Sequence, residues 1–244
     1  MRLLNPKTES MTDAPNTYCP GCGHGVAHRL VAEVIDELGA RERTVGVAPV
    51  GCAVFAYDYW NFDVSEAPHG RAPCVATGIK RMLPKHIVFA YQGDGDLASI
   101  GMGEIIHTAN RGENLTVVFI NNANYGMTGG QLAPTSPIGM KTSTTPNGRT
   151  TSEGHPIRIP ELLNALEAPV YLDRQSLHDP MHIRRAKASL KKAFLNQEEG
   201  KGFSLVELLS ACPSNWRQTP VDSMKWMAEE LTKTFPLGII RDRS

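Results

Sequence analysis

Residues 86–124, HIVFAYQGDGDLASIGMGEIIHTANRGENLTVVFINNAN, decide the fold of this 244-residue chain. An apolar run at 86–92 leads through an acidic, glycine-rich turn into a predicted helix at 99–110, and a second apolar run at 114–122 ends in two asparagines. Continuous apolar strands that alternate with helices are typical of a mainly parallel sheet with both faces covered. Because parallel strands end at the same edge of a sheet, we expect the acidic turn and the asparagines to lie side by side.

The alternation of strands and helices continues on both sides of this segment. We expect further helices at 24–38, 180–196 and 221–235, and further strands at 44–51, 169–174 and 203–210. The stretch 126–160 carries no regular pattern, and loops of that length in compact domains are usually functional or disordered. The sequence therefore predicts an α/β fold, a mainly parallel sheet with helices on both faces.

Composition excludes several classes of protein. Lys plus Arg and Asp plus Glu both total 25, which argues against a nucleic-acid binder because such proteins rely on clustered positive charge. No apolar run approaches the roughly 20 residues of a membrane span. The N-terminus lacks the apolar stretch of a secretory signal, so we expect a cytoplasmic protein.

The turn after residue 92 admits two interpretations. Gly93, Gly95 and Ala98 satisfy a loose G-x-G-x-x-A dinucleotide pattern, which is weak evidence alone. Asp94 lies between the glycines, where a directly bound pyrophosphate would be repelled. A Mg²⁺ ion resolves this conflict, because it takes oxygen ligands from one or two protein groups and from substrate phosphates. Asp94 and Asn122 can supply a carboxylate and an amide oxygen, and a backbone carbonyl just beyond can supply a third.

The five cysteines form an odd number, which in such a chain argues against disulfides. Cys19 and Cys22 have the spacing C-x-x-C, which fits zinc, a redox dithiol or an iron–sulfur cluster. Cys52 and Cys212 each follow a predicted strand, so the four thiols can form one site. Spacing alone does not distinguish zinc from a cluster.

Six motifs occur in one order along the chain: YCPGCGHG at 18–25, GC at 51–52, HGRAPCVATG at 69–78, QGDGD at 92–96, NNANYGMTGGQ at 121–131 and CPSNW at 212–216. In this the chain resembles the thiamine diphosphate-binding β subunit of 2-oxoacid:ferredoxin oxidoreductases, over about residues 18–217. It is similar to the subunits for 2-oxoisovalerate or 2-oxoglutarate. We accordingly divide the chain into an arm at 1–17, a domain at 18–217, and a helix and tail at 218–244 that pack on the core or on a partner subunit.

The resemblance implies three bound groups. Mg²⁺ would be held by Asp94, Asn122 and the carbonyl of Asn124. A [4Fe–4S] cluster would be held by Cys19, Cys22, Cys52 and Cys212. Thiamine diphosphate would be contacted by Gly51, Cys52, His69, Gly93, Asp94, Gly95, Asp96, Asn122, Asn124, Gly126, Met127 and Thr128.

Other residues receive roles from the same resemblance. His69 and Arg71 would contact the substrate carboxylate or a phosphate near the cofactor. Cys74 matches no cluster position, and we expect it to be buried or to pack near the cofactor. Phe55 and Met127 are apolar where some relatives carry larger polar groups, which favours a branched aliphatic substrate.

The implied reaction is oxidative decarboxylation of a 2-oxoacid to an acyl-coenzyme A, with electrons passing through the cluster to ferredoxin. We favour 2-oxoisovalerate, with 2-oxoglutarate as the alternative. In this family the glutamate that activates thiamine belongs to a second, pyrimidine-binding domain, and we find no second α/β domain in these 244 residues. We therefore expect an α subunit that carries this domain, with γ and δ subunits, and activity only in the hetero-oligomer. The rival interpretations are an NAD-dependent dehydrogenase with structural zinc and a noncatalytic zinc-stabilised binding module.

Overall fold

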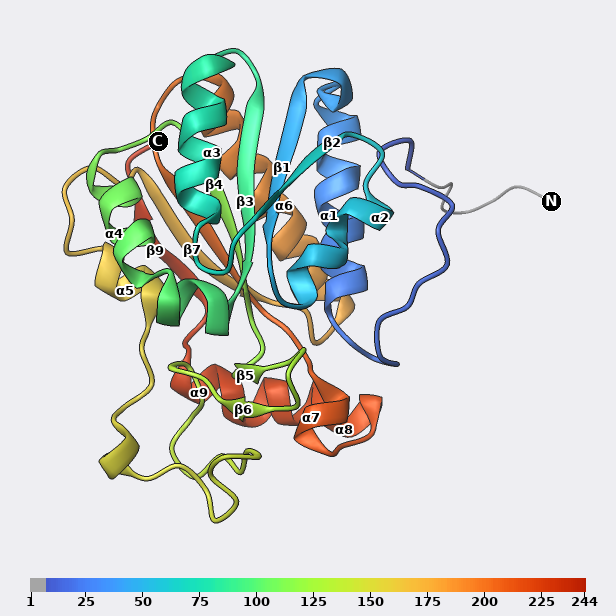
Figure 1. The fold of residues 1–244 in the computed structure, drawn as a ribbon, viewed down its shortest axis with the longest axis vertical. Coiled ribbons are helices and arrows are strands. Elements are labelled where there is room, and N and C mark those ends of the chain that lie inside the picture. The colour runs from blue at the N-terminus through green and yellow to red at the C-terminus, as the bar shows by residue number, and fades with distance from the viewer. Residues whose placement is uncertain (1–7) are drawn as a thin grey trace.

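The computed structural model describes residues 8–244, so the first seven residues of the predicted arm lie outside the described residues. A seven-stranded sheet forms the centre of the molecule, in the order β2-β1-β3-β4-β8-β7-β9 (Figure 1). The strands are β1 (Thr44–Pro49), β2 (Asp63–Ala67), β3 (Ile87–Gly93), β4 (Thr116–Asn121), β7 (Tyr171–Ser176), β8 (Ser204–Leu209) and β9 (Gly238–Asp242). All neighbouring pairs are parallel except β7 and β9. The predicted α/β fold is confirmed.

Helices cover both faces of the sheet, as the continuous apolar strands require. One face packs against α1 (His24–Glu37) and α6 (Pro180–Glu198). The other packs against α3 (Ala72–Met82), α4 (Met102–Asn110) and α5 (Ile159–Leu163). Two apolar cores result, and they are separated by the sheet itself.

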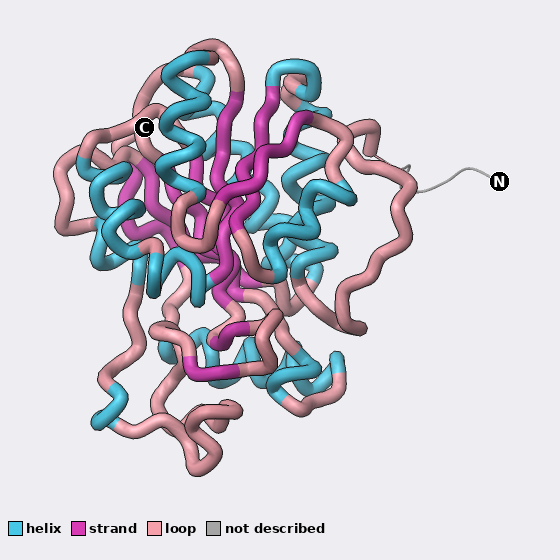
Figure 2. Tube along the Cα trace, in the orientation of Figure 1, coloured by secondary structure: helices cyan, strands magenta, loops and turns pink. Residues whose placement is uncertain are grey.

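Short elements cluster at the carboxyl edge of the sheet, in the lower part of Figure 2. They are β5 (Asn124–Tyr125), β6 (Gln131–Leu132), α7 (Pro213–Trp216), α8 (Pro220–Trp226) and α9 (Thr232–Thr234). The short helix α2 (Ala56–Tyr59) lies higher, near α1 in Figure 1. Single turns of 3₁₀-helix lie at Arg41–Arg43, Cys52–Phe55 and Thr151–Glu153, and wider turns at Asp96–Ile100 and Met227–Leu231. The parallel strands thus end beneath a layer of loops.

The predicted helix at 99–110 is divided in the structure. A wide helical turn, Asp96–Ile100, follows the acidic motif, and α4 starts only at Met102. Gly101 lies between the two and close to Gly70, since a Cβ added at Gly70 would come within 2.8 Å of the Gly101 nitrogen. The acidic motif therefore leads directly into the wide turn.

Strands β2 and β9 and helix α3 are among the elements that were not predicted. Strand β2 is exposed or half-buried at every position except Ala67, and β9 is exposed or half-buried throughout. Such edge strands lack the continuous apolar run that identified the central strands. The pattern of burial, and not the fold class, explains these omissions.

The stretch 126–160 has little regular structure and is held by one buried guanidinium. Arg149 is 4% exposed and donates to the carbonyls of Ser136 (2.6 Å), Gly154 (2.9 Å) and His155 (3.1 Å), among others. These contacts satisfy loop carbonyls that have no strand or helix partner. The loop therefore has a defined path over the sheet edge.

The C-terminal segment after residue 217 packs on the sheet domain. Met227, Leu231 and Phe235 are fully buried and form a third apolar cluster with Ala123 and Leu209. Strand β9 completes the sheet beside β7. Within residues 8–244, no helix is both long and apolar enough to span a bilayer.

Candidate functional site

A cavity of about 530 Å³ opens at the carboxyl edge of β1, β3 and β4. The structure brings every predicted thiamine diphosphate contact to its wall: Gly51, Cys52, His69, Gly93, Asp94, Gly95, Asp96, Asn122, Asn124, Gly126, Met127 and Thr128. Sequence reasoning assigned no cofactor contact to the remaining lining residues, which are His24, Val50, Ala53, Tyr125 and Gln131. Gly95 lies so close to the Tyr125 ring that an added Cβ would come within 2.4 Å of it, so this wall admits only glycine at position 95.

Three oxygens converge where β3 and β4 end. The side-chain oxygen of Asn122 lies 3.2 Å from Asp94 Oδ1 and 2.7 Å from the carbonyl oxygen of Asn124. Turning the Asn122 amide over would place its NH₂ group there, and that group would donate to both oxygens. Without a cation the turned amide is the more favourable one, because oxygens without hydrogens between them repel.

The spacing of these oxygens fits a magnesium ion. Octahedral Mg²⁺ has ligands at about 2.0–2.1 Å, which places adjacent ligand oxygens about 2.9 Å apart. The two measured separations lie on either side of that value. The carboxylate, amide and carbonyl are also the hard oxygen donors that Mg²⁺ prefers.

Asp94 is a buried carboxylate whose partners are neutral. It is 2% exposed, and it accepts hydrogen bonds from Gly95 N (2.8 Å) and Thr135 Oγ (2.6 Å). Burial raises the pKa of Asp94 to about 7, although these two donors lower it. Within residues 8–244 no basic side chain forms an ion pair with Asp94, so a bound cation is the partner that this carboxylate lacks.

Asp96 points to a different task. Its Oδ1 accepts from Gly70 N (2.5 Å) and lies 3.0 Å from His69 Nδ1, and its Oδ2 accepts from Gln92 Nε2 (2.5 Å). Burial raises the pKa of Asp96, while the hydrogen bond from Gln92 opposes the rise. His69 Nδ1 also lies 2.9 Å from the carbonyl oxygen of Val50. The ring is thus held through Nδ1, and Nε2 is the nitrogen available to the cavity.

The structure does not bring Arg71 to the cavity. Its guanidinium pairs with Glu104 and donates to the carbonyl of Ile100 at 3.2 Å. The Arg71 side chain therefore binds groups at the start of α4. This placement does not support the predicted contact with substrate carboxylate or phosphate.

Phe55 likewise lies off the cavity wall. Its ring meets the ring of Tyr18 edge-on at 5.9 Å, whereas Met127 lines the cavity. Of the two residues used to predict an aliphatic substrate, only Met127 is in position to contact one.

Cys19, Cys22, Cys52 and Cys212 approach one another beside the cavity. A Cβ added to Gly126 would lie 3.2 Å from the sulfur of Cys52 and 3.9 Å from that of Cys212. The C-x-x-C loop is tied to the same place, because Gly23 N donates to the carbonyl of Ala211 at 3.2 Å. Three chain segments therefore supply thiols to one region.

Burial makes two of these thiols, Cys52 and Cys22, weaker acids than ordinary cysteines. Burial first, and neighbouring thiols second, raise the pKa of Cys52 to about 11; burial likewise raises the pKa of Cys22 to about 12. A metal centre bound by these sulfurs would displace their protons. Tetrahedral zinc, with bonds of about 2.3 Å, holds its sulfurs about 3.8 Å apart.

No such compact thiol set is present in the described part of the chain. The single group of three metal-ligating side chains with donor atoms within 4.8 Å consists of His178, Asp179 and His182. There Asp179 caps α6, accepting from His182 N at 2.8 Å.

The expectation for Cys74 is wrong. It lies on α3 and is exposed, and it does not line the cavity. The motif around it is helical, and this position of α3 faces away from the sheet. Cys74 is thus a free surface thiol in this structure.

Comparison with known proteins agrees with this geometry. Residues 49–208 match the family described as thiamine pyrophosphate enzyme, C-terminal TPP binding domain. The chain is 52% identical over 93% of its length to ketoisovalerate oxidoreductase subunit VorA of Methanothermobacter thermautotrophicus, covering 48% of that protein. It is 36% identical over 90% of its length to 2-oxoglutarate synthase subunit KorB of Archaeoglobus fulgidus, covering 78% of that protein.

A solved structure extends the comparison to three dimensions. The 2-oxoglutarate:ferredoxin oxidoreductase from Magnetococcus marinus, determined with 2-oxoglutarate, coenzyme A and succinyl-CoA bound, superposes with a TM-score of 0.81 at 25% identity. The match covers 100% of this chain and 87% of that one.

Fold and site together define a thiamine diphosphate-binding domain. Within that class, the chain belongs to the β-type subunits of the 2-oxoacid:ferredoxin oxidoreductases. The chain spans about half the length of the ketoisovalerate oxidoreductase subunits that it matches.

Proposed function

We propose that this chain is the thiamine diphosphate- and cluster-binding subunit of an enzyme that oxidatively decarboxylates a branched-chain 2-oxoacid. The product would be an acyl-coenzyme A, and the electrons would pass to ferredoxin. The observation that carries the proposal is the approach of the Asn122 amide to buried Asp94 and to the Asn124 carbonyl, inside a cavity walled by the predicted cofactor contacts. Membership of the 2-oxoacid oxidoreductase family supports the same reaction.

Asp94, Asn122 and the Asn124 carbonyl would hold Mg²⁺ against the diphosphate. Gly93 and Gly95 let the backbone approach the phosphates closely. Thiamine diphosphate supplies the chemistry of decarboxylation when bound, and the protein supplies orientation and exclusion of water. The buried position of the three ligands supports such a water-poor site.

His69 is the residue of this chain best placed to exchange a proton in the cavity. Asp96 and the Val50 carbonyl hold the ring through Nδ1. Its Nε2 would then accept or return a proton at the reacting end of the substrate. This role rests on orientation, since His69 lines the cavity.

Cys19, Cys22, Cys52 and Cys212 would hold a [4Fe–4S] cluster that accepts electrons one at a time. Gly126 supports a short path, because it lines the cavity and a Cβ added to it would lie 3.2 Å from the sulfur of Cys52. Ferredoxin would be the external acceptor.

The lining of the cavity favours an aliphatic substrate. Among residues 8–244 that line it, none is lysine or arginine, and the carboxylates present are Asp94 and Asp96. The second carboxylate of 2-oxoglutarate would meet acids and no base from this chain. Val50 and Met127 offer apolar surface instead. The higher identity to a ketoisovalerate oxidoreductase subunit points the same way, and 2-oxoglutarate remains the alternative.

Other subunits would complete the site. Both acids in the cavity are engaged, Asp94 with the proposed metal and Asp96 with His69. The glutamate that activates thiamine would therefore come from an α subunit with a pyrimidine-binding domain. With γ and δ subunits, the assembly would be a hetero-oligomer that uses coenzyme A as cosubstrate. Contact surface for other subunits is offered by three apolar side chains that are about half exposed: Val50, Ile100 and Met127.

The decisive experiment is anaerobic purification of the assembled complex, followed by analysis for thiamine, iron and sulfide. The complex is then assayed for coenzyme A-dependent reduction of ferredoxin with 2-oxoisovalerate, 2-oxoglutarate, pyruvate and indolepyruvate. We expect bound thiamine diphosphate, iron with sulfide, and the highest rate with 2-oxoisovalerate. Zinc without iron would overturn the electron-transfer role, and tight NAD without thiamine would favour a dehydrogenase.

A pair of cysteine variants tests the cluster. Cys212→Ser should lose iron and the paramagnetic signal of the reduced cluster, because it removes one thiolate. Cys74→Ser is the matched control, since Cys74 is an exposed thiol outside the proposed set. Unchanged iron content in Cys212→Ser would show that Cys212 is not a ligand.

A further inference from the structure

The turn that carries two of the proposed magnesium ligands has an uncommon backbone. Ala123 lies between Asn122 and Asn124 with φ at +59°, in the left-handed region that residues with a Cβ rarely adopt. Among residues 8–244 the other non-glycine residue with positive φ is Arg217. Such a conformation persists only where surrounding contacts enforce it.

Contacts hold the Ala123 residue on both sides. Its N–H donates to Asn121 Oδ1 at 3.1 Å. Its carbonyl accepts from Ser136 Oγ at 2.6 Å, and Ser136 Oγ in turn accepts from Ala133 N at 3.0 Å. Ala123 is fully buried, so water cannot replace these partners. The left-handed turn is therefore fixed by Asn121 from one side and by Ser136 from the other.

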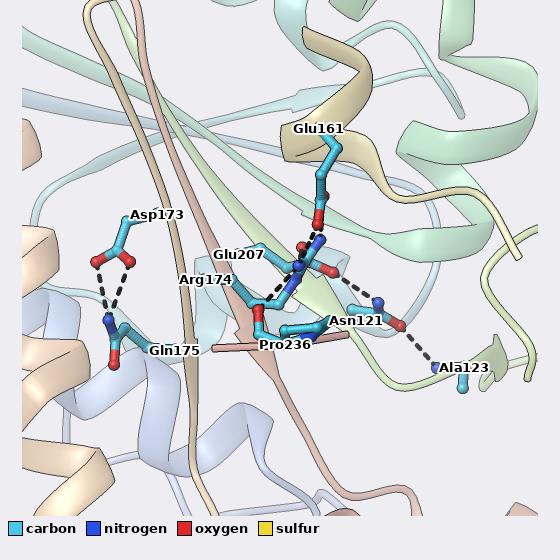
Figure 3. A network of polar contacts seen from close by, with 8 residues as sticks. All are labelled: Asn121, Ala123, Glu161, Asp173, Arg174, Gln175, Glu207 and Pro236. Atoms are coloured by element: carbon cyan, nitrogen blue, oxygen red, sulfur yellow. Dashed lines mark hydrogen bonds and ion pairs between the residues drawn. The ribbon is translucent and has the colours of Figure 1, made fainter. Parts of the chain in front are cut away.

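Asn121 is itself the end of a hydrogen-bonded series that crosses the sheet, shown in Figure 3. Asn121 Nδ2 donates to Glu207 Oε1 at 2.7 Å, and Arg174 Nε donates to Glu207 Oε2 at 2.6 Å. Arg174 also forms two bonds to Glu161, at 2.8 and 2.6 Å, and one to the Pro236 carbonyl at 3.0 Å. We call Arg174, Glu207 and Asn121 the buried polar series; all three are 0% exposed.

The sheet register creates this series. Arg174 of β7 lies directly opposite Glu207 of β8, and Asn121 of β4 lies opposite Leu209, two residues beyond Glu207 on the same face. A buried ion pair rarely makes a fold more stable than well-packed apolar residues would. Stability alone therefore does not account for the series. The residue at its end does, because the series terminates on the N–H of Ala123, which lies between two proposed magnesium ligands.

We propose that the buried polar series positions the magnesium ligands. By fixing the left-handed backbone of Ala123, Asn121 aims the two ligands of the turn at Asp94. Glu207 and Arg174 hold the Asn121 amide in the one orientation that offers its oxygen to the turn. This inference rests on the magnesium and thiamine diphosphate site proposed above, and none of the three residues touches the cofactor.

The test is binding of thiamine diphosphate to the assembled complex at fixed Mg²⁺, measured by calorimetry, with Mn²⁺ paramagnetic resonance reporting the metal's ligands. Asn121→Ala removes the link to Ala123 and leaves the ion pair of Arg174 and Glu207 intact. We expect thiamine diphosphate affinity to fall at least tenfold and the Mn²⁺ spectrum to change. Asn196→Ala is the matched control, a truncation of an equally buried asparagine on α6 that should leave affinity unchanged.

A second substitution separates positioning from general damage. Glycine enters the left-handed region readily, so Ala123→Gly should restore much of the affinity in the Asn121→Ala background. Ala123→Gly alone should change affinity little, because Asn121 still holds the turn. A merely structural role for Asn121 would give no such rescue.

Each outcome decides between the two proposals. If the wild-type complex binds thiamine diphosphate and Asn121→Ala binds it equally well, positioning is wrong and the proposed site stands. Failure of the wild-type complex to bind the cofactor overturns the proposed function and this inference with it. If Asn121→Ala does not assemble, Asn121→Ser replaces it, because the serine hydroxyl is too short to reach the Ala123 N–H while it is bonded to Glu207. Asn121→Ser must then show the same loss of affinity and the same rescue by Ala123→Gly. Normal thiamine diphosphate affinity in Asn121→Ser would overturn the proposal that the series positions the ligands.

Discussion

Two carboxylates lie inside the protein on either side of β4, Asp94 at the end of β3 and Glu207 within β8, at 2% and 0% exposure. Glu207 is matched by protein alone, with the Arg174 guanidinium on one oxygen and the Asn121 amide on the other. Asp94 has only neutral donors, Gly95 N and the Thr135 hydroxyl. The two carboxylates are thus similarly buried, but only Glu207 has an opposite charge beside it.

The difference shows how the site is divided between structure and function. A buried charge without an opposite charge is unfavourable, and proteins retain one mainly where function requires it. Glu207 gains its opposite charge when the chain folds, whereas under the proposed function Asp94 gains one only when Mg²⁺ binds. Removing the Arg174 charge beside Glu207 should therefore destabilise the fold. Removing the Asp94 carboxylate should instead weaken binding of thiamine diphosphate with Mg²⁺.

The largest expected effect is at the compensated carboxylate. Arg174→Met leaves Glu207 buried without its partner, and breaking a buried pair in this way costs about 3–5 kcal/mol. We expect the free energy of unfolding, measured by denaturant titration, to fall by about that amount. The double variant Arg174→Met/Glu207→Gln should recover part of the loss, because no unpaired charge remains. A loss below about 1 kcal/mol in the single variant, small beside the cost above, would contradict the comparison.

The uncompensated carboxylate should respond in the opposite way. Asp94→Asn keeps an oxygen for Gly95 N and can donate to the Thr135 hydroxyl, so both local contacts survive. Unfolding stability without cofactor should therefore not fall. Binding of thiamine diphosphate with Mg²⁺ should weaken at least 100-fold, about 2.7 kcal/mol, because the charged ligand is gone. Calorimetry checks the binding; unchanged affinity would refute the metal assignment.

The central sheet could be predicted from the sequence because its strands are buried on both faces. Strands such as 86–92 and 114–122 read as continuous apolar runs, and the structure places them at β3 and β4. The edge strands β2 and β9 escaped notice because half-exposed strands leave no such run. Their positions depend on packing against neighbours that the local sequence does not record.

The part of the candidate site that could be predicted consists of metal-binding side chains placed at the ends of adjacent strands. Asp94 and Asn122 follow adjacent parallel strands, so their meeting required only the fold class. The arrangement around Glu207 could not be read in advance, because it depends on the register of Arg174 opposite Glu207 and on a left-handed Ala123. These features arise from tertiary contacts between distant segments.

A smaller effect should follow from weakening one neutral donor to the uncompensated carboxylate. Thr135→Val keeps the side-chain shape and removes the 2.6 Å hydrogen bond to Asp94 Oδ2. Hydrogen bonds to charged groups contribute about 1.5–3 kcal/mol, so we expect roughly tenfold weaker binding of thiamine diphosphate. Thr108→Val is the control, since that hydroxyl is buried without a partner and lies on α4. Equal effects of the two variants in calorimetry would show that the bond to Asp94 does not matter.

The smallest effect should come from a third carboxylate, one that water can reach. Asp179 caps α6, accepting from His182 N at 2.8 Å, and it also contacts the rings of His178 and His182. The backbone N–H of His182, followed by its side chain, lowers the pKa of Asp179 to about 2. Because the folded-state pKa is below the ordinary value, the stabilisation is present above about pH 4 and is lost as pH falls through about 2.

Asp179→Ala should therefore lower the melting temperature by a few degrees at most at pH 7, and the difference from wild type should vanish near pH 2. Asp179→Asn, which keeps the capping oxygen without the charge, should lose less. Thiamine diphosphate affinity should be unchanged in both variants, because the cap lies outside the cavity. If Asp179→Ala destabilised the protein as strongly as Arg174→Met, exposure to water would not explain why the carboxylates differ in their effect on stability. The contrast between Asp94 and Glu207 would then need a cause other than the presence or absence of a charged partner for a buried carboxylate.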